Sequence, residues 1–136
     1  MLRPLADAGT RQAHVLAASS VLDPAMRVFS SPARRCVDTV APLARRAGVQ
    51  VEIDELLYEG RGSAALEGLR GALRSAPSAS IVACTHGDVL ASLLNALVHE
   101  DGLVLPDSVR WAEASTWIID FDDAGAASAA TYRTVD

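Results

Sequence analysis

A histidine that follows a short apolar run is the first candidate for chemistry in this sequence. The run Ile81–Cys84 has the length and β-branched content of a buried strand, and Val89 and Leu90 begin an apolar stripe at helical spacing. His86 thus lies at a strand-to-helix turn, where open α/β sheets bind ligands and where the helix amino terminus favours an anion. We expect His86 to face a phosphate; the alternative is a histidine that only caps or packs in the turn.

Two arginines occupy a second junction of the same kind. Arg34 and Arg35 follow the strand candidate Arg27–Ser30, and Ser31 and Pro32 suit the cap and the first position of a helix. The sequence contains no lysine, so an anion site in this chain must use arginine, histidine and backbone amides. By residue type alone, the two arginines either bind an anion or are solvated on the helix surface.

Two carboxylates lie close to these junctions in the sequence. Glu59 falls in the loop after the strand candidate Val49–Ile53, and Asp88 comes two residues after His86. A general acid that protonates a leaving group needs a carboxyl pKa raised by burial or by neighbouring negative charge. The sequence does not choose between Glu59 and Asp88, and either is otherwise an ordinary loop carboxylate.

The remaining histidines and the two cysteines point to no further site. His14 lies on a helix candidate over residues 10–21 and is expected at the surface, and His99 lies in a polar turn and is expected to be exposed. Cys36 and Cys84 are expected to be reduced, buried thiols of a cytoplasmic protein. No spacing of His, Cys and Asp resembles a ligand set, so no metal cofactor is expected.

Length and composition narrow the class of protein. The 136 residues are 50% apolar, which fits a single domain over residues 1–136 with one core. No apolar run reaches the roughly 18 residues that span a bilayer, and the amino terminus lacks the pattern of a secretory signal. The net charge of −5 and the absence of a basic tract argue against nucleic-acid and membrane-surface partners.

Strand and helix patterns alternate along the chain, which predicts an α/β fold with a largely parallel sheet. Besides the strand and helix around His86, the patterns predict helices from Ser31 to Gly48 and over 65–76, strands over 27–30, 49–53 and 115–121, and a hairpin arm over 128–135.

Taken in order, four segments resemble the histidine phosphatase superfamily, also called phosphoglycerate-mutase-like. Among its members, the chain looks most similar to the small bacterial phosphohistidine phosphatases and the related domains that follow Nudix modules. The similar segments are 3–13 (first-helix signature), 30–39 (S-S-P-x-x-R-x-x-Q-T), 57–59 (acidic residue after the third strand) and 85–88 (second histidine motif). The resemblance covers nearly the whole chain and implies a three-layer sandwich with a mostly parallel sheet.

The resemblance also implies roles for particular residues. Arg35 matches the arginine that clamps the phosphate, and His86 matches the histidine that holds the phosphoryl oxygens. Glu59 and Asp88 are the candidate general acids, and Arg34 is expected to face solvent. The implied partner is a phosphorylated small molecule or a phosphohistidine protein, which the family hydrolyses without a metal.

The sequence departs from the family pattern in one decisive place. It contains no Arg-His-Gly, the motif that carries the family's nucleophilic histidine at the end of its first, central strand. We therefore expect an amino-terminally shortened phosphatase that lacks this strand and is inactive in phosphoenzyme chemistry. The alternatives are a homo-oligomer in which a partner copy supplies the strand, an inactive anion-binding module, and an acid/base reaction of His86 with Asp88 or Glu59. A smaller departure is Asp38, where the family usually has glutamine.

Overall fold

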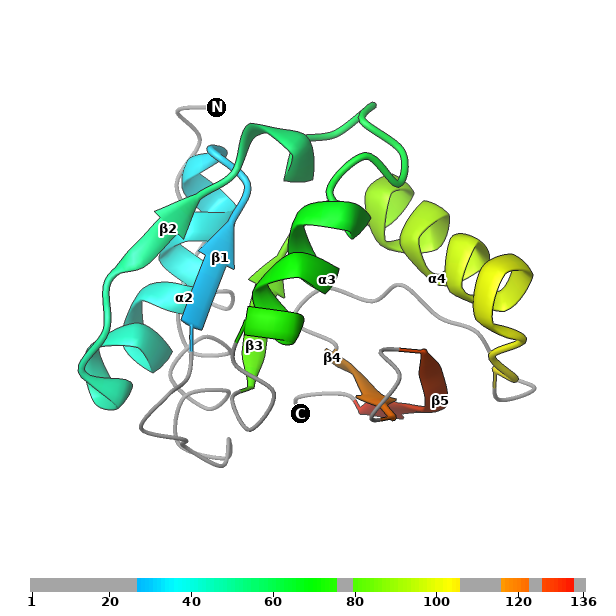
Figure 1. Ribbon diagram of the computed structural model, residues 1–136. Coiled ribbons are helices and arrows are strands. Elements are labelled where there is room, and N and C mark those ends of the chain that lie inside the picture. Colours follow the sequence, from blue (N-terminus) through cyan, green and yellow to red (C-terminus); the bar gives the residue numbers. More distant parts are fainter. Residues whose placement is uncertain (1–26, 76–79, 106–115, 123–125, 134–136) are drawn as a thin grey trace.

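The computed structural model describes residues 27–75, 80–105, 116–122 and 126–133, and these form alternating strands and helices (Figure 1). The predicted helix over 10–21 and His14 lie outside the described residues. The elements are β1 (Arg27–Ser30), α2 (Arg34–Ala47), β2 (Val51–Ile53), the 3-10 turn η1 (Glu55–Leu57), α3 (Leu66–Ser75), β3 (Ile81–Cys84), α4 (Gly87–Asp101), β4 (Thr116–Phe121) and β5 (Ala127–Arg133). The predicted α/β class with a parallel sheet is confirmed.

The parallel sheet has three strands in the order β2-β1-β3. Val28 of β1 pairs with Val51 on one side and with Val82 on the other, and both ladders are parallel. Because parallel strands end at the same edge, the residues that follow β1, β2 and β3 are brought together. We call this edge, formed by Ser30–Ser31, Asp54 and Thr85–His86, the carboxyl edge.

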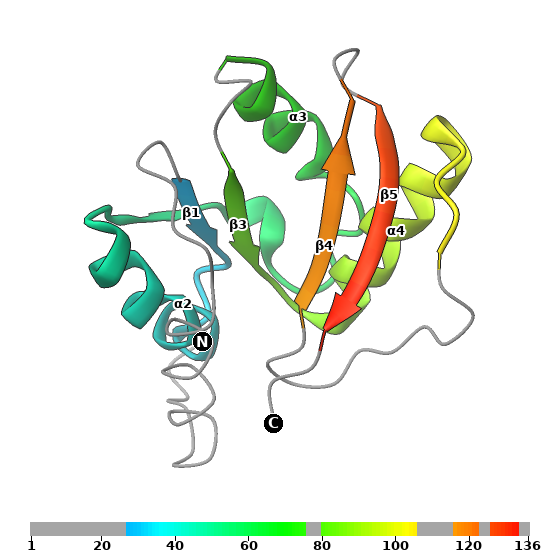
Figure 2. The same cartoon turned by 90° about the horizontal axis from the view of Figure 1, so that it is seen from below.

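Strands β4 and β5 form a separate antiparallel hairpin, as the sequence predicted. Within the described residues no ladder joins β3 to β4. Figure 2 shows β3 and β4 as successive strands in the row β1, β3, β4, β5, with their arrowheads pointing in opposite directions. The sheet is thus divided into two pieces at the β3–β4 position.

The prediction that β3 is buried was wrong. The strand occupies the predicted residues Ile81–Cys84, but three of its side chains are half-buried and Ala83 is exposed. The reason is its place in the sheet, since β3 pairs with β1 and ends the three-stranded piece. An apolar run typical of a central strand therefore lies at an edge of this piece.

The predicted start of the first described helix was also too early. Helix α2 begins at Arg34 with Ala33 as its N-cap, not at Pro32. Ser31 remains extended because its amide donates to the Cys84 carbonyl oxygen at 3.0 Å, which continues the β1–β3 pairing. The helix ends as predicted at Gly48, whose φ of 73° is the left-handed conformation favoured by glycine.

Two groups of buried side chains hold the layers together. Helix α2 packs on the three-stranded sheet, and helices α3 and α4 pack with the β4–β5 hairpin. The first group consists of Val28, Val40, Leu43 and Ala44, and the second of Leu66, Val89, Leu93, Leu97, Leu103 and Ala127. This packing of α4 fixes the position of its first turn, and therefore of His86, relative to the rest of the fold.

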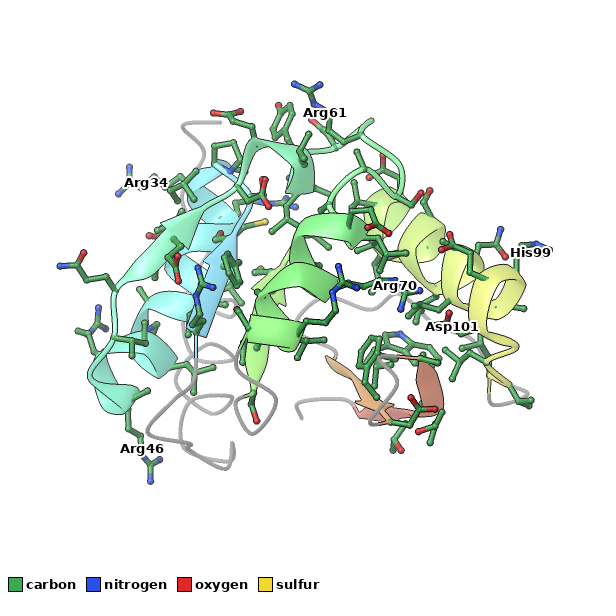
Figure 3. All side chains as sticks on the ribbon, in the orientation of Figure 1. Arg34, Arg46, Arg61, Arg70, His99 and Asp101 are labelled. Carbon is green, nitrogen blue, oxygen red and sulfur yellow. The ribbon has the colours of Figure 1, made fainter. Side chains whose placement is uncertain are left out.

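A buried ion pair ties α3, α4 and β5 to one another. The Arg70 guanidinium of α3 donates to Asp101 Oδ2 of α4 at 2.9 Å, and the side chains are only 8% and 10% exposed (Figure 3). The Ala127 amide of β5 donates to the same oxygen at 2.8 Å. This amide, and then Arg70, lower the pKa of Asp101.

Replacing Asp101 with asparagine should lower the free energy of unfolding by about 3 kcal/mol at neutral pH, because the buried Arg70 loses its charged partner at 2.9 Å and the exposed Glu100, at 3.7 Å, does not replace it. Since the folded pKa of Asp101 is depressed, its contribution is complete above the ordinary aspartate pKa of about 3.9 and is lost as the pH falls through the folded value. Urea unfolding at several pH values measures both effects. Glu100→Gln is the control, because Glu100 is 55% exposed and should change the free energy by under about 1 kcal/mol. Equal losses in the two variants would contradict the assignment.

Candidate phosphate site at the carboxyl edge

Backbone hydrogen bonds hold the three segments of the carboxyl edge in a fixed relation. The Asp54 amide donates to the Ser30 carbonyl oxygen at 2.9 Å, and the Ser31 amide donates to the Cys84 carbonyl oxygen at 3.0 Å. The Thr85 hydroxyl donates to the Leu57 carbonyl oxygen. Side chains that follow β1, β2 and β3 therefore start from an ordered backbone.

His86 is the N-cap residue of α4, with extended backbone angles, but its side chain makes no capping hydrogen bond. The alternative of a capping side chain is therefore wrong, whereas the alternative of a histidine that packs in the turn stays open. Its Nε2 lies 2.9 Å from Ser31 Oγ, and its ring meets the Tyr58 ring edge-on with 5.3 Å between centroids. The imidazole is half-exposed, so these two contacts orient it while leaving part of it accessible.

Arg35 lies in the first turn of α2 and is exposed. Hydrogen bonds with Cys84 and Ser31, and then the positive charge of Arg35, lower the pKa of the Cys36 thiol. Cys36 Sγ in turn lies 4.0 Å from His86 Nε2. Arg35 in the first turn of α2 and His86 at the start of α4 both follow strands of the parallel sheet, and a shared role in binding an anion stays a prediction.

The Arg34 side chain lies on the surface of α2. Its side chain is 58% exposed, forms an ion pair of 3.6 Å with Asp38 within α2, and extends away from the body of the molecule in Figure 3. The expectation that Arg34 faces solvent agrees with this geometry. Asp38 is engaged in the same surface pair.

The backbone adds positive potential to the carboxyl edge. Helices α2 and α4 both begin there, and the first turn of α2 contains no acidic residue. Unsatisfied N–H groups and the helix dipole make such termini favourable for an anion. Arg35 lies at the start of α2 and His86 at the start of α4, whose first turn also contains the acidic Asp88.

The two candidate acids, Glu59 and Asp88, are both exposed and lie beside this edge. Asp88 Oδ2 accepts a hydrogen bond of 2.7 Å from the Gly60 amide, which fixes the 59–62 loop to the first turn of α4. A hydrogen bond with Glu59 raises the pKa of Tyr58, whose ring contacts His86. Both carboxylates are therefore near His86, and the geometry does not single out one of them.

Three contacts at the edge were not predicted from the sequence: Ser31 with His86, Tyr58 with His86, and Cys36 with Cys84. The prediction of buried thiols holds for Cys36, which is 5% exposed, whereas Cys84 is half-buried. Ser31 directly follows β1 and Cys84 ends β3. A prediction that these two strands pair would therefore have placed the two residues side by side.

Ser31→Ala should lower the free energy of unfolding by about 1–2 kcal/mol, because Ser31 Oγ also accepts a hydrogen bond from the buried Ala33 amide. The same change removes the 2.9 Å contact to His86 Nε2. Urea unfolding measures the first effect, and the ¹⁵N shifts of the His86 ring measure the second. Ser75→Ala is the control, because that exposed hydroxyl only donates to the Ala72 carbonyl oxygen. Unchanged ring shifts in Ser31→Ala would remove Ser31 from the site.

No group of three or more His, Cys, Asp or Glu side chains in the described part of the chain is placed to hold a metal ion. No helix among the same residues is both long and apolar enough to cross a bilayer.

The family model of the histidine phosphatase superfamily (branch 1) matches residues 3–70, which is half of the 136 residues. The chain belongs to the histidine phosphatase superfamily. The matched region contains β1, β2 and α2, and hence Ser31, Arg35 and Glu59. No curated protein matches the chain.

Solved structures show the same fold. The protein histidine phosphatase SixA complexed with tungstate superposes with a TM-score of 0.75 at 16% identity, over 97% of this chain and 84% of that one. The mycobacterial glucosyl-3-phosphoglycerate phosphatase complexed with VO3 gives 0.61 at 19% identity, over 94% and 84%. The putative phosphohistidine phosphatase SixA from Agrobacterium tumefaciens gives 0.55 at 25% identity, over 73% and 64%. The predicted superfamily, and the likeness to its phosphohistidine phosphatases, are confirmed.

Proposed function

We propose that the carboxyl edge binds the phosphoryl group of a phosphomonoester or a phosphohistidine, with Arg35 and His86 as its principal contacts. The observation that supports this proposal is the position of Cys36, whose thiol lies 4.0 Å from His86 Nε2 and whose pKa is also lowered by the charge of Arg35. A planar guanidinium can make two parallel hydrogen bonds to a phosphoryl group. An imidazolium adds charge where the transition state becomes more negative.

The neighbouring groups prepare this arrangement. Ser31 and Tyr58 hold the His86 ring, so little side-chain freedom has to be lost when an anion binds. The starts of α2 and α4 supply backbone N–H groups. Two relatives of the same fold are described as complexes with tungstate and VO3, and these oxyanions are therefore suitable probes of the edge.

The proposal assigns the nucleophile to a strand that is not among the described elements. In the family, a histidine nitrogen attacks phosphorus while the bond to the leaving group breaks, and water then cleaves the P–N bond to release phosphate. Glu59 or Asp88 protonates the leaving group in the first step. The sequence contains no Arg-His-Gly to supply that nitrogen, so we propose that this chain alone binds the phosphoryl group without transferring it.

The division of the sheet indicates where such a strand would fit. A strand between β3 and β4 that runs parallel to β3 would be antiparallel to β4, because these two strands point in opposite directions (Figure 2). Its carboxyl end would then lie at the carboxyl edge beside Cys84 and His86. A separate segment could supply it, whereas a second copy of the chain could supply a pairing strand but not the nucleophilic histidine, since its sequence contains no Arg-His-Gly either. Two free thiols and the family's substrates favour a cytoplasmic protein.

The chain as given should bind tungstate in calorimetric titration and should hydrolyse p-nitrophenyl phosphate no faster than buffer. Binding follows from Arg35 and His86, and the lack of turnover follows from the missing nucleophile. His86→Ala should weaken the binding. Clear turnover by the given chain that His86→Ala abolishes would contradict the nucleophile argument, and no tungstate binding at all would contradict the phosphate site. If the chain binds tungstate and no added strand with a histidine gives turnover, the alternative of an inactive anion-binding module is favoured.

A further inference from the structure

The two cysteines of the described chain meet at the carboxyl edge. Cys84 is the last residue of β3, and Cys36 lies in the first turn of α2, the helix that packs on this strand. Each thiol affects the pKa of the other, and Cys84 packs against the buried side chains of α2. Both are free thiols, and Cys84 is half-buried at the end of a strand that ends its sheet piece.

The surroundings of the pair differ from those of an inert core cysteine. Cys36 Sγ lies 4.0 Å from His86 Nε2, and Ser31 and Arg35 also act on this thiol. The hydrogen bond from Cys84, then that of Ser31 and the charge of Arg35, lower the pKa of Cys36. The hydrogen bond to Cys36 and burial raise the pKa of Cys84 well above its ordinary value. The two thiols are thus unequal, with the thiolate favoured at Cys36.

We propose that Cys36 and Cys84 are a reactive thiol pair that a hydroperoxide converts to an intramolecular disulfide at the carboxyl edge. Cys84 packs against the buried face of α2, and Cys36 lies on that face four residues before Val40, which brings the two thiols to one interface. A positive side chain, a helix amino terminus and an imidazole form the electropositive setting typical of reactive cysteines. Because Cys36 is only 5% exposed and Cys84 is half-buried, the oxidant has to be as small as hydrogen peroxide.

The chemistry balances with hydrogen peroxide as the only co-reactant. The Cys36 thiolate attacks one peroxide oxygen, the O–O bond breaks, and hydroxide leaves, which gives a sulfenic acid at Cys36. The Cys84 sulfur then attacks the Cys36 sulfur, the S–O bond breaks, and water leaves with the thiol proton. In sum, two thiols and one peroxide become one disulfide and two waters. A dithiol reductant reverses the modification.

The test is peroxide treatment of the full chain, followed by alkylation of free thiols and peptide mapping without reductant. We expect a peptide pair joined through Cys36 and Cys84 within one chain, no alkylation at either residue, and recovery of both thiols with dithiothreitol. Alkylation of both cysteines after treatment would overturn the proposal, and so would a disulfide between two chains. The outcome does not depend on phosphate binding or turnover, so failure here is distinguishable from failure of the proposed function.

Two single variants separate the roles of the thiols. Cys84→Ser should leave a sulfenic acid at Cys36 that dimedone traps, because the second thiol is gone. In Cys36→Ser the remaining thiol, Cys84, should react with peroxide about tenfold more slowly than Cys36 does in Cys84→Ser. Cys84 lacks the groups that favour a thiolate. Equal rates in the two variants would overturn the assignment of Cys36 as the attacking thiol. Circular dichroism of each variant before treatment shows whether it is folded.

Discussion

Arg35→Ala is expected to weaken tungstate binding by about 2–4 kcal/mol, or roughly 30- to 900-fold in Kd. The guanidinium is the strongest donor available at the carboxyl edge, and the starts of α2 and α4 alone do not replace a charged, bidentate contact. Arg35 is exposed and forms no ion pair with another side chain in the described part of the chain, so its removal should leave folding unchanged. Isothermal titration at constant ionic strength measures the loss, because salt screens part of the attraction.

Arg34→Ala is the matched control for this measurement. It removes the same charge from the adjacent residue, but Arg34 pairs with Asp38 and extends away from the molecule (Figure 3). Its effect on tungstate binding should stay under about 1 kcal/mol. Similar losses in both variants would mean that the anion responds only to net charge. An unchanged affinity in Arg35→Ala would remove this residue from the site.

The local parts of the site could be predicted from the sequence because they depend on neighbours in the chain. The apolar run Ile81–Cys84, the turn at His86 and the helical stripe after it gave the observed strand, N-cap position and helix. The end of α2 was predicted from Gly48 for the same reason, since a glycine at the end of a helix acts through its own backbone conformation. The start of α2 was missed because a contact distant in sequence, between the Ser31 amide and the Cys84 carbonyl, keeps the chain extended there.

Contacts between segments far apart in the sequence could not be predicted. The Ser31 contact with His86 and the meeting of Cys36 with Cys84 require the β1–β3 register, in which Ser30 lies opposite Cys84. No local pattern encodes that register. The edge-on contact of Tyr58 with His86 likewise depends on how the loop after β2 returns toward α4, where Asp88 holds the Gly60 amide.

Strand β3 is more exposed than its sequence predicts. The apolar, β-branched residues Ile81–Cys84 predicted a strand buried between other strands. In the structure they form an edge strand of the three-stranded sheet, and Ala83 is exposed. Apolar, β-branched sequence at an exposed edge is unfavourable, because it leaves backbone groups and apolar surface open to other chains. Both observations agree if another strand pairs with β3 on the β4 side.

An extended peptide that ends in Arg-His-Gly, preceded by about six apolar and β-branched residues, is expected to confer turnover on the chain. Placed between β3 and β4 and parallel to β3, it would carry its histidine to the carboxyl edge beside His86 and Arg35. Hydrolysis of p-nitrophenyl phosphate should rise by about a thousandfold or more over the chain alone, because a nucleophile is the component whose loss is most damaging in such enzymes. The melting temperature should rise with peptide concentration, since binding to the folded state stabilises it.

The same peptide with glutamine in place of histidine separates strand pairing from chemistry. It should raise the melting temperature to the same extent but give no turnover. Activity with the histidine peptide should fall when the chain carries Arg35→Ala or His86→Ala, and should be little affected by Arg34→Ala. Stabilisation by neither peptide would contradict a strand site between β3 and β4. Stabilisation by both peptides without turnover from either would keep that strand site and reject the proposal that the histidine reaches the phosphoryl group there.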